Sequence, residues 1–268
     1  MSDPTPATLA VVMSEEGTPR EGLAGAGTSS EGTSEPGDAQ GSSHGREPVS
    51  LDGLRRIFEK DLQCGLPPDW EDRNEALYRL VVDANSGCNL TRLTDRADFL
   101  IKHVADSLLL ARAWPEIRDN ELRVADIGCG AGLPGLVLAL SFPRLRLTEV
   151  DSASKKITCV ERFLAELSLE RCSAVASRAR ELGRRPEFQG TFDLVVARAV
   201  APTAALLRET RQLLTPGGAL IAYKTPAQVT EELPDLKREA ARRKLSVRAS
   251  ECYQLPAAAG ERQFLIVS

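Results

Sequence analysis

A glycine-rich loop between an apolar run and a helical pattern constrains the fold more than any other feature of the sequence. Residues 122–127 are expected to form a buried strand, Gly128 to Gly135 a turn, and residues 136–142 a helix. Glycine allows a tight turn and a close approach to a ligand, and a helix start offers free N–H groups. The segment therefore predicts a ligand site at the carboxyl end of a strand in an open α/β sheet.

Strand and helix patterns alternate after residue 120, which indicates a mostly parallel sheet with helices on both faces. The expected strands cover 145–150, 172–177, 192–197 and 219–224, and the expected helices cover 154–167, 202–213 and 227–244. Two further expected strands, 246–254 and 261–267, would close the sheet as a hairpin. Such a hairpin is typical of methyltransferases rather than of dehydrogenases.

The sequence predicts three regions. Residues 1–48 contain no aromatic residue and are rich in Gly, Ser, Thr, Glu and Pro, which predicts a disordered acidic tail. Residues 49–118 show helical spacing, with apolar positions such as Leu51, Leu54 and Phe58, and we expect an N-terminal helical extension. Residues 119–268 then form the ligand-binding α/β domain.

Composition excludes several other classes of protein. The six cysteines form no C-x-x-C pair, so neither a disulfide framework nor a metal site is expected. No apolar run reaches the roughly 20 residues of a membrane span, and the amino terminus lacks signal-peptide features, so we expect a cytoplasmic protein.

Residues 1–50 hold eight acidic and two basic residues. Since the net charge of the whole chain is −4, the remaining residues are weakly basic. This balance permits RNA binding without arguing for it.

Two acidic residues make the loop more specific. Asp126 precedes Gly128 in the pattern D-x-G-x-G-x-G, which resembles the signature of S-adenosylmethionine-dependent methyltransferases. Asp151 ends the next strand, where a carboxylate can accept hydrogen bonds from ribose hydroxyls. The turn L-x-P-G-G-x-L at 214–220 agrees with this class. The alternative is a structural turn beside a surface acid.

The residues that are missing narrow the choice of methyl acceptor. The turn after the fourth strand, 199–202, lacks the (N/D)-P-P-(Y/F) pattern used on exocyclic amines, and no cysteine follows a proline as in carbon-5 methylation. An acceptor with a free lone pair, such as guanine N7, needs neither. Its alkylation is an in-line displacement that requires mainly alignment.

Residues from about 80 to 268 resemble the 16S ribosomal RNA guanine-N7 methyltransferase family, RsmG or GidB. The segments that identify it follow one another in order: 85–91, Lys102-His103 with Asp106-Ser107, 126–135, 150–155, 177–181, 197–201, Tyr223-Lys224 and 260–262. The resemblance implies a Rossmann-like class I fold with a seven-stranded sheet and an N-terminal helical extension. It also implies the substrate, a guanine in the decoding-region (530) loop of 16S rRNA in the small ribosomal subunit.

The resemblance and the motifs together suggest site residues. Cofactor contacts are expected at Gly128, Leu133, Ala179, Arg180 and Arg198 from the resemblance, and at Asp126, Gly130 and Asp151 from the motifs. His103, Asp106 and Arg198 are candidates for positioning the acceptor, without any certain catalytic residue. Candidates for RNA contact are Asn85, Asn89, Lys102, Lys155 and Lys224. We expect a monomer without a metal ion.

Three other functions stay open at this point. A small-molecule methyltransferase could use the helical extension as a lid, and a nicotinamide-dependent oxidoreductase could use a similar glycine loop. A non-catalytic RNA-binding module could keep the cofactor fold.

Two residues depart from the pattern of the family that the chain resembles. Arg180 and Thr225 stand where the family often has an acid and a glycine.

Overall fold

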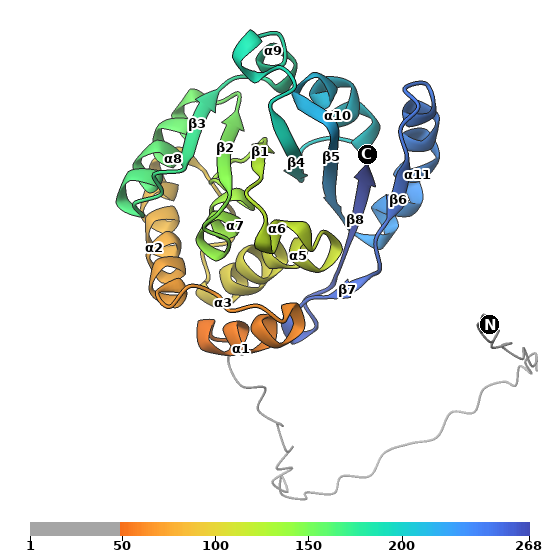
Figure 1. Cartoon of the computed structure of the whole chain (residues 1–268). Helices are drawn as coiled ribbons and strands as arrows, with labels where there is room; N and C mark the ends of the chain where they lie inside the picture. The colour runs from red at the N-terminus through yellow and green to blue at the C-terminus, as the bar shows by residue number, and fades with distance from the viewer. Residues whose placement is uncertain (1–48) are drawn as a thin grey trace, which may run out of the picture. The chain divides into compact units, whose positions relative to one another are not determined.

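A single twisted sheet organises the protein, as the computed structural model of residues 49–268 shows (Figure 1). The expected tail, 1–48, lies outside these described residues. The sheet contains β1 (Arg123–Ile127), β2 (Arg146–Asp151), β3 (Cys172–Ala176), β4 (Phe192–Arg198), β5 (Leu214–Lys224), β6 (Val247–Ala249), β7 (Tyr253–Gln254) and β8 (Glu261–Val267).

Helices precede the sheet and alternate with its strands. Before β1 come α1 (Leu51–Leu62), α2 (Trp70–Cys88), α3 (Arg96–Phe99), a π-helical turn η1 (Leu100–Ala105), α4 (Asp106–Leu108), α5 (Leu110–Ala113) and α6 (Glu116–Asp119). Between and after the strands come α7 (Gly135–Ser141), α8 (Ser154–Glu166), α9 (Ala179–Leu182), α10 (Thr203–Thr210) and α11 (Pro226–Ala241). The 3-10 turns are η2 (Pro186–Phe188), η3 (Arg211–Leu213) and η4 (Pro256–Ala258).

The strand order is β3-β2-β1-β4-β5-β8-β6, with β7 pairing with β8. Strands β1 to β5 are parallel, whereas β8 runs antiparallel to β5, β6 and β7. This arrangement confirms the predicted mostly parallel sheet with a closing hairpin. The expected strand at 246–254 is broken, so that its second part, β7, forms a separate two-residue strand.

The alternation of side chains along the strands divides the apolar core into two halves. Val124 of β1 belongs to the half packed against α1, α2, α7 and α8. Its neighbour Ala125 belongs to the other half, which contains apolar side chains of α9, α10 and α11. Both halves are buried, as expected of a parallel sheet with helices on both faces.

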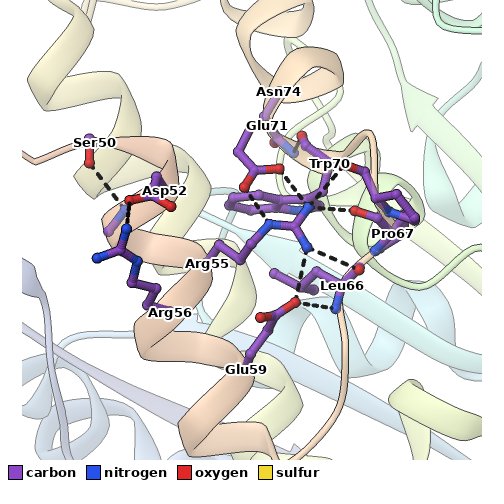
Figure 2. A network of polar contacts seen from close by, with 12 residues as sticks. Ser50, Asp52, Arg55, Arg56, Glu59, Leu66, Pro67, Trp70, Glu71 and Asn74 are labelled. Carbon is purple, nitrogen blue, oxygen red and sulfur yellow. Dashed lines mark hydrogen bonds and ion pairs between the residues drawn. The ribbon is translucent and has the colours of Figure 1, made fainter.

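A polar network joins α1 to the start of α2 (Figure 2). The Arg55 guanidinium pairs with Glu59 and Glu71 and donates to the carbonyl oxygens of Leu66 and Pro67. The fully buried Trp70 indole N–H donates to the Ser141 hydroxyl of α7 at 2.8 Å. The helices before β1 therefore share a core with the sheet domain.

The helical run before Pro115 consists of several short elements. It begins at Arg96 and includes the π-helical turn η1, which is followed by α4 and α5. π-helical turns are uncommon and frequently occur at functional sites. Here the turn contains Lys102 and His103, and Asp106 and Ser107 follow it.

Candidate active site

The loop after β1 adopts backbone conformations that favour glycine. Gly128, Gly130 and Gly132 have φ values of 71°, 58° and 78°. A side chain at Gly128 would also meet a neighbour, because a Cβ built there lies 2.5 Å from Cγ2 of Val200. The loop and the segment after β4 therefore approach each other closely.

Two carboxylates at the strand ends hold this loop in place. Asp126 Oδ2 accepts a hydrogen bond from the Gly135 N–H at 2.8 Å. Asp151 accepts from the Gly130 N–H at 3.0 Å and, through its other oxygen, from the Ala153 N–H at 2.9 Å. Each carboxylate thus binds backbone donors that a turn leaves unsatisfied.

A cavity of about 570 Å³ opens beside the loop. This volume lies within the roughly 300–1,000 Å³ of small-molecule sites. Gly128, Asp151, Ala179 and Arg180, four of the predicted cofactor contacts, line it together with Val200. We call this the nucleoside cavity, since it has an acid at a strand end, where nucleotide-binding folds commonly hold a ribose.

The other predicted cofactor contacts lie elsewhere. Asp126 is fully buried beneath the loop, and Leu133 is nearly so. Neither they nor Gly130 line the nucleoside cavity. Arg198 lines a second cavity of about 460 Å³.

The second cavity, which we call the arginine cavity, is separated from the first by the segment after β4. Arg198 and Ala199 line the arginine cavity, whereas Val200, two residues beyond Arg198, lines the nucleoside cavity. Ala199 has a φ of 57°, which turns the chain between them. The two cavities therefore lie on either side of this turn.

Asp106 is the central charge of the arginine cavity. Its oxygens accept from Arg198 Nη1 at 2.9 Å and from Arg262 Nε and Nη2 at 2.5 and 3.0 Å. The Asp106 side chain is 1 % exposed, and those of Arg198 and Arg262 are 11 % and 15 % exposed. Both guanidiniums also lie near the ring of buried Tyr223, at 5.9 and 6.0 Å from its centroid. The trio therefore has a net positive charge.

His103 links Arg198 to the segment after α2. Burial, and then the Arg198 charge, lower the pKa of His103 to about 3, so the ring is neutral at physiological pH. Arg198 Nη2, which can only donate, lies 3.3 Å from Nδ1, so Nδ1 is the acceptor. We assign the ring proton to Nε2, which lies 3.0 Å from the Thr91 hydroxyl oxygen. His103 is thus a connector between Thr91 and Arg198.

The structure separates the predicted RNA contacts into three kinds. Lys155 and Asn89 are exposed, and Lys102 is partly exposed and paired with Asp98 at 2.8 Å. Asn85 caps the turn after α2, since its side-chain oxygen accepts from the Thr91 N–H at 2.9 Å.

Lys224 does not fit the predicted role of an RNA contact. Its side chain is 6 % exposed and pairs with Glu232 at 2.7 Å, and its ammonium also donates to the Ala201 carbonyl at 3.0 Å. This burial arises because the end of β5 is covered by α11, which provides Glu232. Lys224 instead holds the turn after β4 through Ala201.

Sequence reasoning missed three residues of the site. Arg262 was noted within a family segment but not as a partner of Asp106, from which it is separated by 156 positions. Its place follows from the antiparallel pairing of β8 with β5, which a local pattern does not reveal. Tyr223 and Val200 likewise resemble ordinary core or turn residues in the sequence.

Two searches of the described part of the chain found nothing. Within residues 49–268, no helix has both the length and the apolar character needed to cross a membrane. In the same residues, no cluster of three or more His, Cys, Asp or Glu side chains is suited to a metal ion.

Comparison with known proteins identifies the family. The GidB family profile, described as rRNA small subunit methyltransferase G, matches residues 71–264. Proteins named ribosomal RNA small subunit methyltransferase G are similar to this chain. The one from Synechococcus sp. strain JA-3-3Ab is 38% identical, over 66% of this chain and 70% of its own length. One from Lactobacillus delbrueckii subsp. bulgaricus is 33% identical (75% and 84%), and that of Carboxydothermus hydrogenoformans is 35% identical (72% and 80%).

The residues that the family profile matches include the glycine loop and the strand ends that line both cavities. The chain therefore belongs to the rRNA small subunit methyltransferase G family, and it is an rRNA methyltransferase.

Proposed function

We propose that the protein transfers a methyl group from S-adenosylmethionine to N7 of a guanine in the 530 loop of 16S rRNA, within the small ribosomal subunit. The observation that supports this most is the pair of cavities on either side of the segment Arg198–Val200. One has an acid at a strand end, as a ribose needs, and the other is lined by Lys102, Arg198 and Arg262, which are hydrogen-bond donors.

The nucleoside cavity fits the adenosine part of the cofactor. Asp151 can accept from ribose hydroxyls, because each of its oxygens has spare acceptor capacity beside its bond to the loop. Val200 and Ala179 offer apolar contact to a base, and the positive-φ glycine at 128 leaves room for a close approach. The bound cofactor would supply an electrophilic methyl on a sulfonium.

The arginine cavity fits an acceptor that needs no general base. Asp106 already accepts from two guanidiniums, and the remaining lone pair of neutral His103 faces Arg198. A nitrogen with its own lone pair, such as guanine N7, can attack without losing a proton. The protein's contribution is then to align the base with the cofactor.

The donors of the arginine cavity favour guanine over adenine. Arg198, Arg262 and Lys102 offer N–H groups. Guanine presents the acceptor O6 beside N7, whereas adenine presents the donor N6 amino group at the equivalent place. Donors around the base would therefore bind guanine and reject adenine.

The acceptor class is tested by methyl transfer from radiolabelled S-adenosylmethionine. The acceptors are undermethylated small subunits, deproteinised 16S rRNA and a small-molecule extract. We expect label in rRNA, in at least one of its two forms. Label in the small-molecule extract alone would leave the fold assignment standing and overturn the proposed acceptor. Retention of NAD without methyl transfer would overturn the proposed cofactor.

A further inference from the structure

Two carboxyl groups lie side by side beneath the glycine loop. Asp126 of β1 and Glu149 of β2 are neighbours in the parallel register, and both are 0 % exposed. Asp126 Oδ2 accepts from the Gly135 N–H. Asp126 Oδ1 and both Glu149 oxygens make no hydrogen bond with any residue in 49–268. Three buried acceptor atoms in this part of the core therefore have no hydrogen-bond partner among these residues.

Glu149 is in contact with the loop itself. A Cβ built on Gly135 would lie 2.3 Å from Glu149 Oε1 and 3.1 Å from the Asp126 Cβ. A Cβ on Gly132 would lie 3.5 Å from the same Glu149 oxygen. The absence of a side chain at Gly135 thus makes room for the Glu149 carboxyl, and the loop packs directly on it.

Two ionised carboxylates cannot occupy this space at an acceptable cost, because an uncompensated buried charge tends to be neutralised by a proton. Burial, opposed mainly by the Gly135 N–H, raises the pKa of Asp126 to about 6. Burial, and then the Asp126 charge, raise the pKa of Glu149 well above its usual range. If the two carboxyl groups share one proton, one of the oxygens that lack a hydrogen-bond partner becomes a donor to the other carboxyl group.

The surroundings decide which carboxyl keeps the proton. Asp126 has the Gly135 N–H bond and the attraction of Arg198 from β4, both of which favour its charged form. Around Glu149 are the thiols of Cys129 in the loop and Cys172 in β3. The Asp151 carboxylate of β2 acts on Asp126 and Cys129 and adds further negative charge.

The Cys129 thiol and the Leu136 N–H favour the charged form of Glu149, but they are outweighed by burial and by the Asp126 charge. The Leu136 N–H also donates to the Gly132 carbonyl at 2.8 Å. The charge of the pair is therefore better placed on Asp126 and the proton on Glu149.

We propose that Glu149 is a positioning residue that keeps its proton at neutral pH and donates it to Asp126, so that the pair has one negative charge and holds the glycine loop through Gly135. Asp126 then bonds on both sides, to Glu149 and to Gly135. The loop geometry that forms the nucleoside cavity depends on this shared proton.

The proposal gives a definite sign for the pH dependence of stability. The pKa of Glu149 is higher in the folded than in the unfolded protein, so the unfolded state loses this proton first as pH rises. The associated stability is fully present below the ordinary glutamate pKa and is lost progressively as pH rises toward the folded pKa. Glu149→Gln keeps an N–H donor for Asp126 without titrating.

The first test is infrared difference spectroscopy of the cofactor-free protein at pH 7 in heavy water. We expect the wild type to show the carbonyl band of one buried protonated carboxyl, which Glu149→Gln loses. If the wild type has no such band, or if Glu149→Gln keeps it unchanged, the assignment of the proton to Glu149 is overturned.

The second test compares melting temperatures from pH 5 to pH 9. Because glutamine does not titrate, we expect the Tm of Glu149→Gln to rise relative to that of the wild type as pH increases from 5 to 9 and to exceed it at pH 9. Glu149→Leu, which removes the donor as well, keeps the test usable if the glutamine variant fails to fold.

Glu239 provides the matched control. It is also a buried glutamate, but it pairs with Arg208, Arg242 and Arg243. Glu239→Gln should lower the Tm at pH 9, because it removes the partner of three guanidiniums. A Tm gain at high pH in both variants, or in neither, would contradict the proposal. Neither test requires methyl transfer, so the result is independent of the proposed substrate.

Discussion

Asp106 shows how one side chain can determine the chemistry of the arginine cavity. It is buried between two guanidiniums, and it is the charge that allows Arg198 and Arg262 to lie close together. Without it, two like charges would face each other in a poorly solvated space. Because it pairs with both guanidiniums, we interpret Asp106 as the residue that orients Arg198.

Replacing Asp106 by Asn should therefore destabilise the fold and impair catalysis together. We expect a loss of about 3–5 kcal/mol in the free energy of unfolding, as for removal of one partner from a buried ion pair. Urea unfolding monitored by circular dichroism measures it. A loss below about 1 kcal/mol would show that the trio behaves as a surface cluster.

His103 makes a second prediction at this scale, on stability in acid. Its folded pKa of about 3 lies below the ordinary histidine value, so the unfolded state binds a proton first as pH falls. This contribution to stability is present above about pH 6.5 and is lost as pH falls toward 3, with a slope of about 1.4 kcal/mol per pH unit.

His103→Gln, which retains an acceptor for Arg198, should reduce this slope. Unfolding free energies between pH 7 and pH 4.5 check the prediction, with wild type and variant in the same buffers. Parallel curves would mean that His103 titrates normally in the folded protein.

Among elements, the segment from β1 through the glycine loop to α7 could be predicted from the sequence because its determinants are local. Gly128, Gly130 and Gly132 all have the positive φ that their pattern suggests. The hairpin formed by β8 was also predicted, but not the break that creates β7. Local periodicity did not reveal the π-helical turn at 100–105 either.

Contacts between distant elements could not be predicted in this way. Arg262 reaches Asp106, 156 positions away in the sequence, because β8 pairs with β5. Lys224 was a candidate for RNA contact, but α11 buries it beside Glu232. Both outcomes depend on how the elements pack, whereas a motif specifies residues within one element.

A pair of glycine variants tests the loop as an element. Gly128→Val should abolish detectable cofactor binding, because its side chain would meet Val200 at 2.5 Å. Gly130→Ala is the control, since it has a similar φ but nothing within 4 Å of its Cβ. It should lose only about 1–2 kcal/mol of stability from backbone strain. Calorimetric titration with S-adenosylhomocysteine measures the affinity of each variant. Equal affinities would mean that the loop is not part of the cofactor site.

At the scale of the whole molecule, unpaired cations gather at the rim of the nucleoside cavity. Arg178, Arg180 and Arg184 are exposed lining residues for which no ion pair occurs within the described region, 49–268. Many other exposed arginines, such as Arg56 and Arg146, pair with acids. We interpret the rim as a surface for rRNA phosphates, which arginine binds well.

Replacing both Arg180 and Arg184 by alanine should weaken binding to small subunits and reduce the salt dependence of binding. The slope of log K against log salt should fall by about 1.5, if each arginine contacts one phosphate. The control is the double alanine variant of Arg56 and Arg146, which should keep the slope. An unchanged slope in the rim variant would place the RNA elsewhere.

The most direct test of the account is the identity of the methylated nucleoside. Small subunits lacking the modification are incubated with the protein and S-adenosylmethionine, and their 16S rRNA is digested and analysed by mass spectrometry. The account predicts one 7-methylguanosine per subunit, located in the 530 loop, and its absence when Asp106→Asn replaces the wild type. Methylation of another base or atom by the wild-type protein would contradict it.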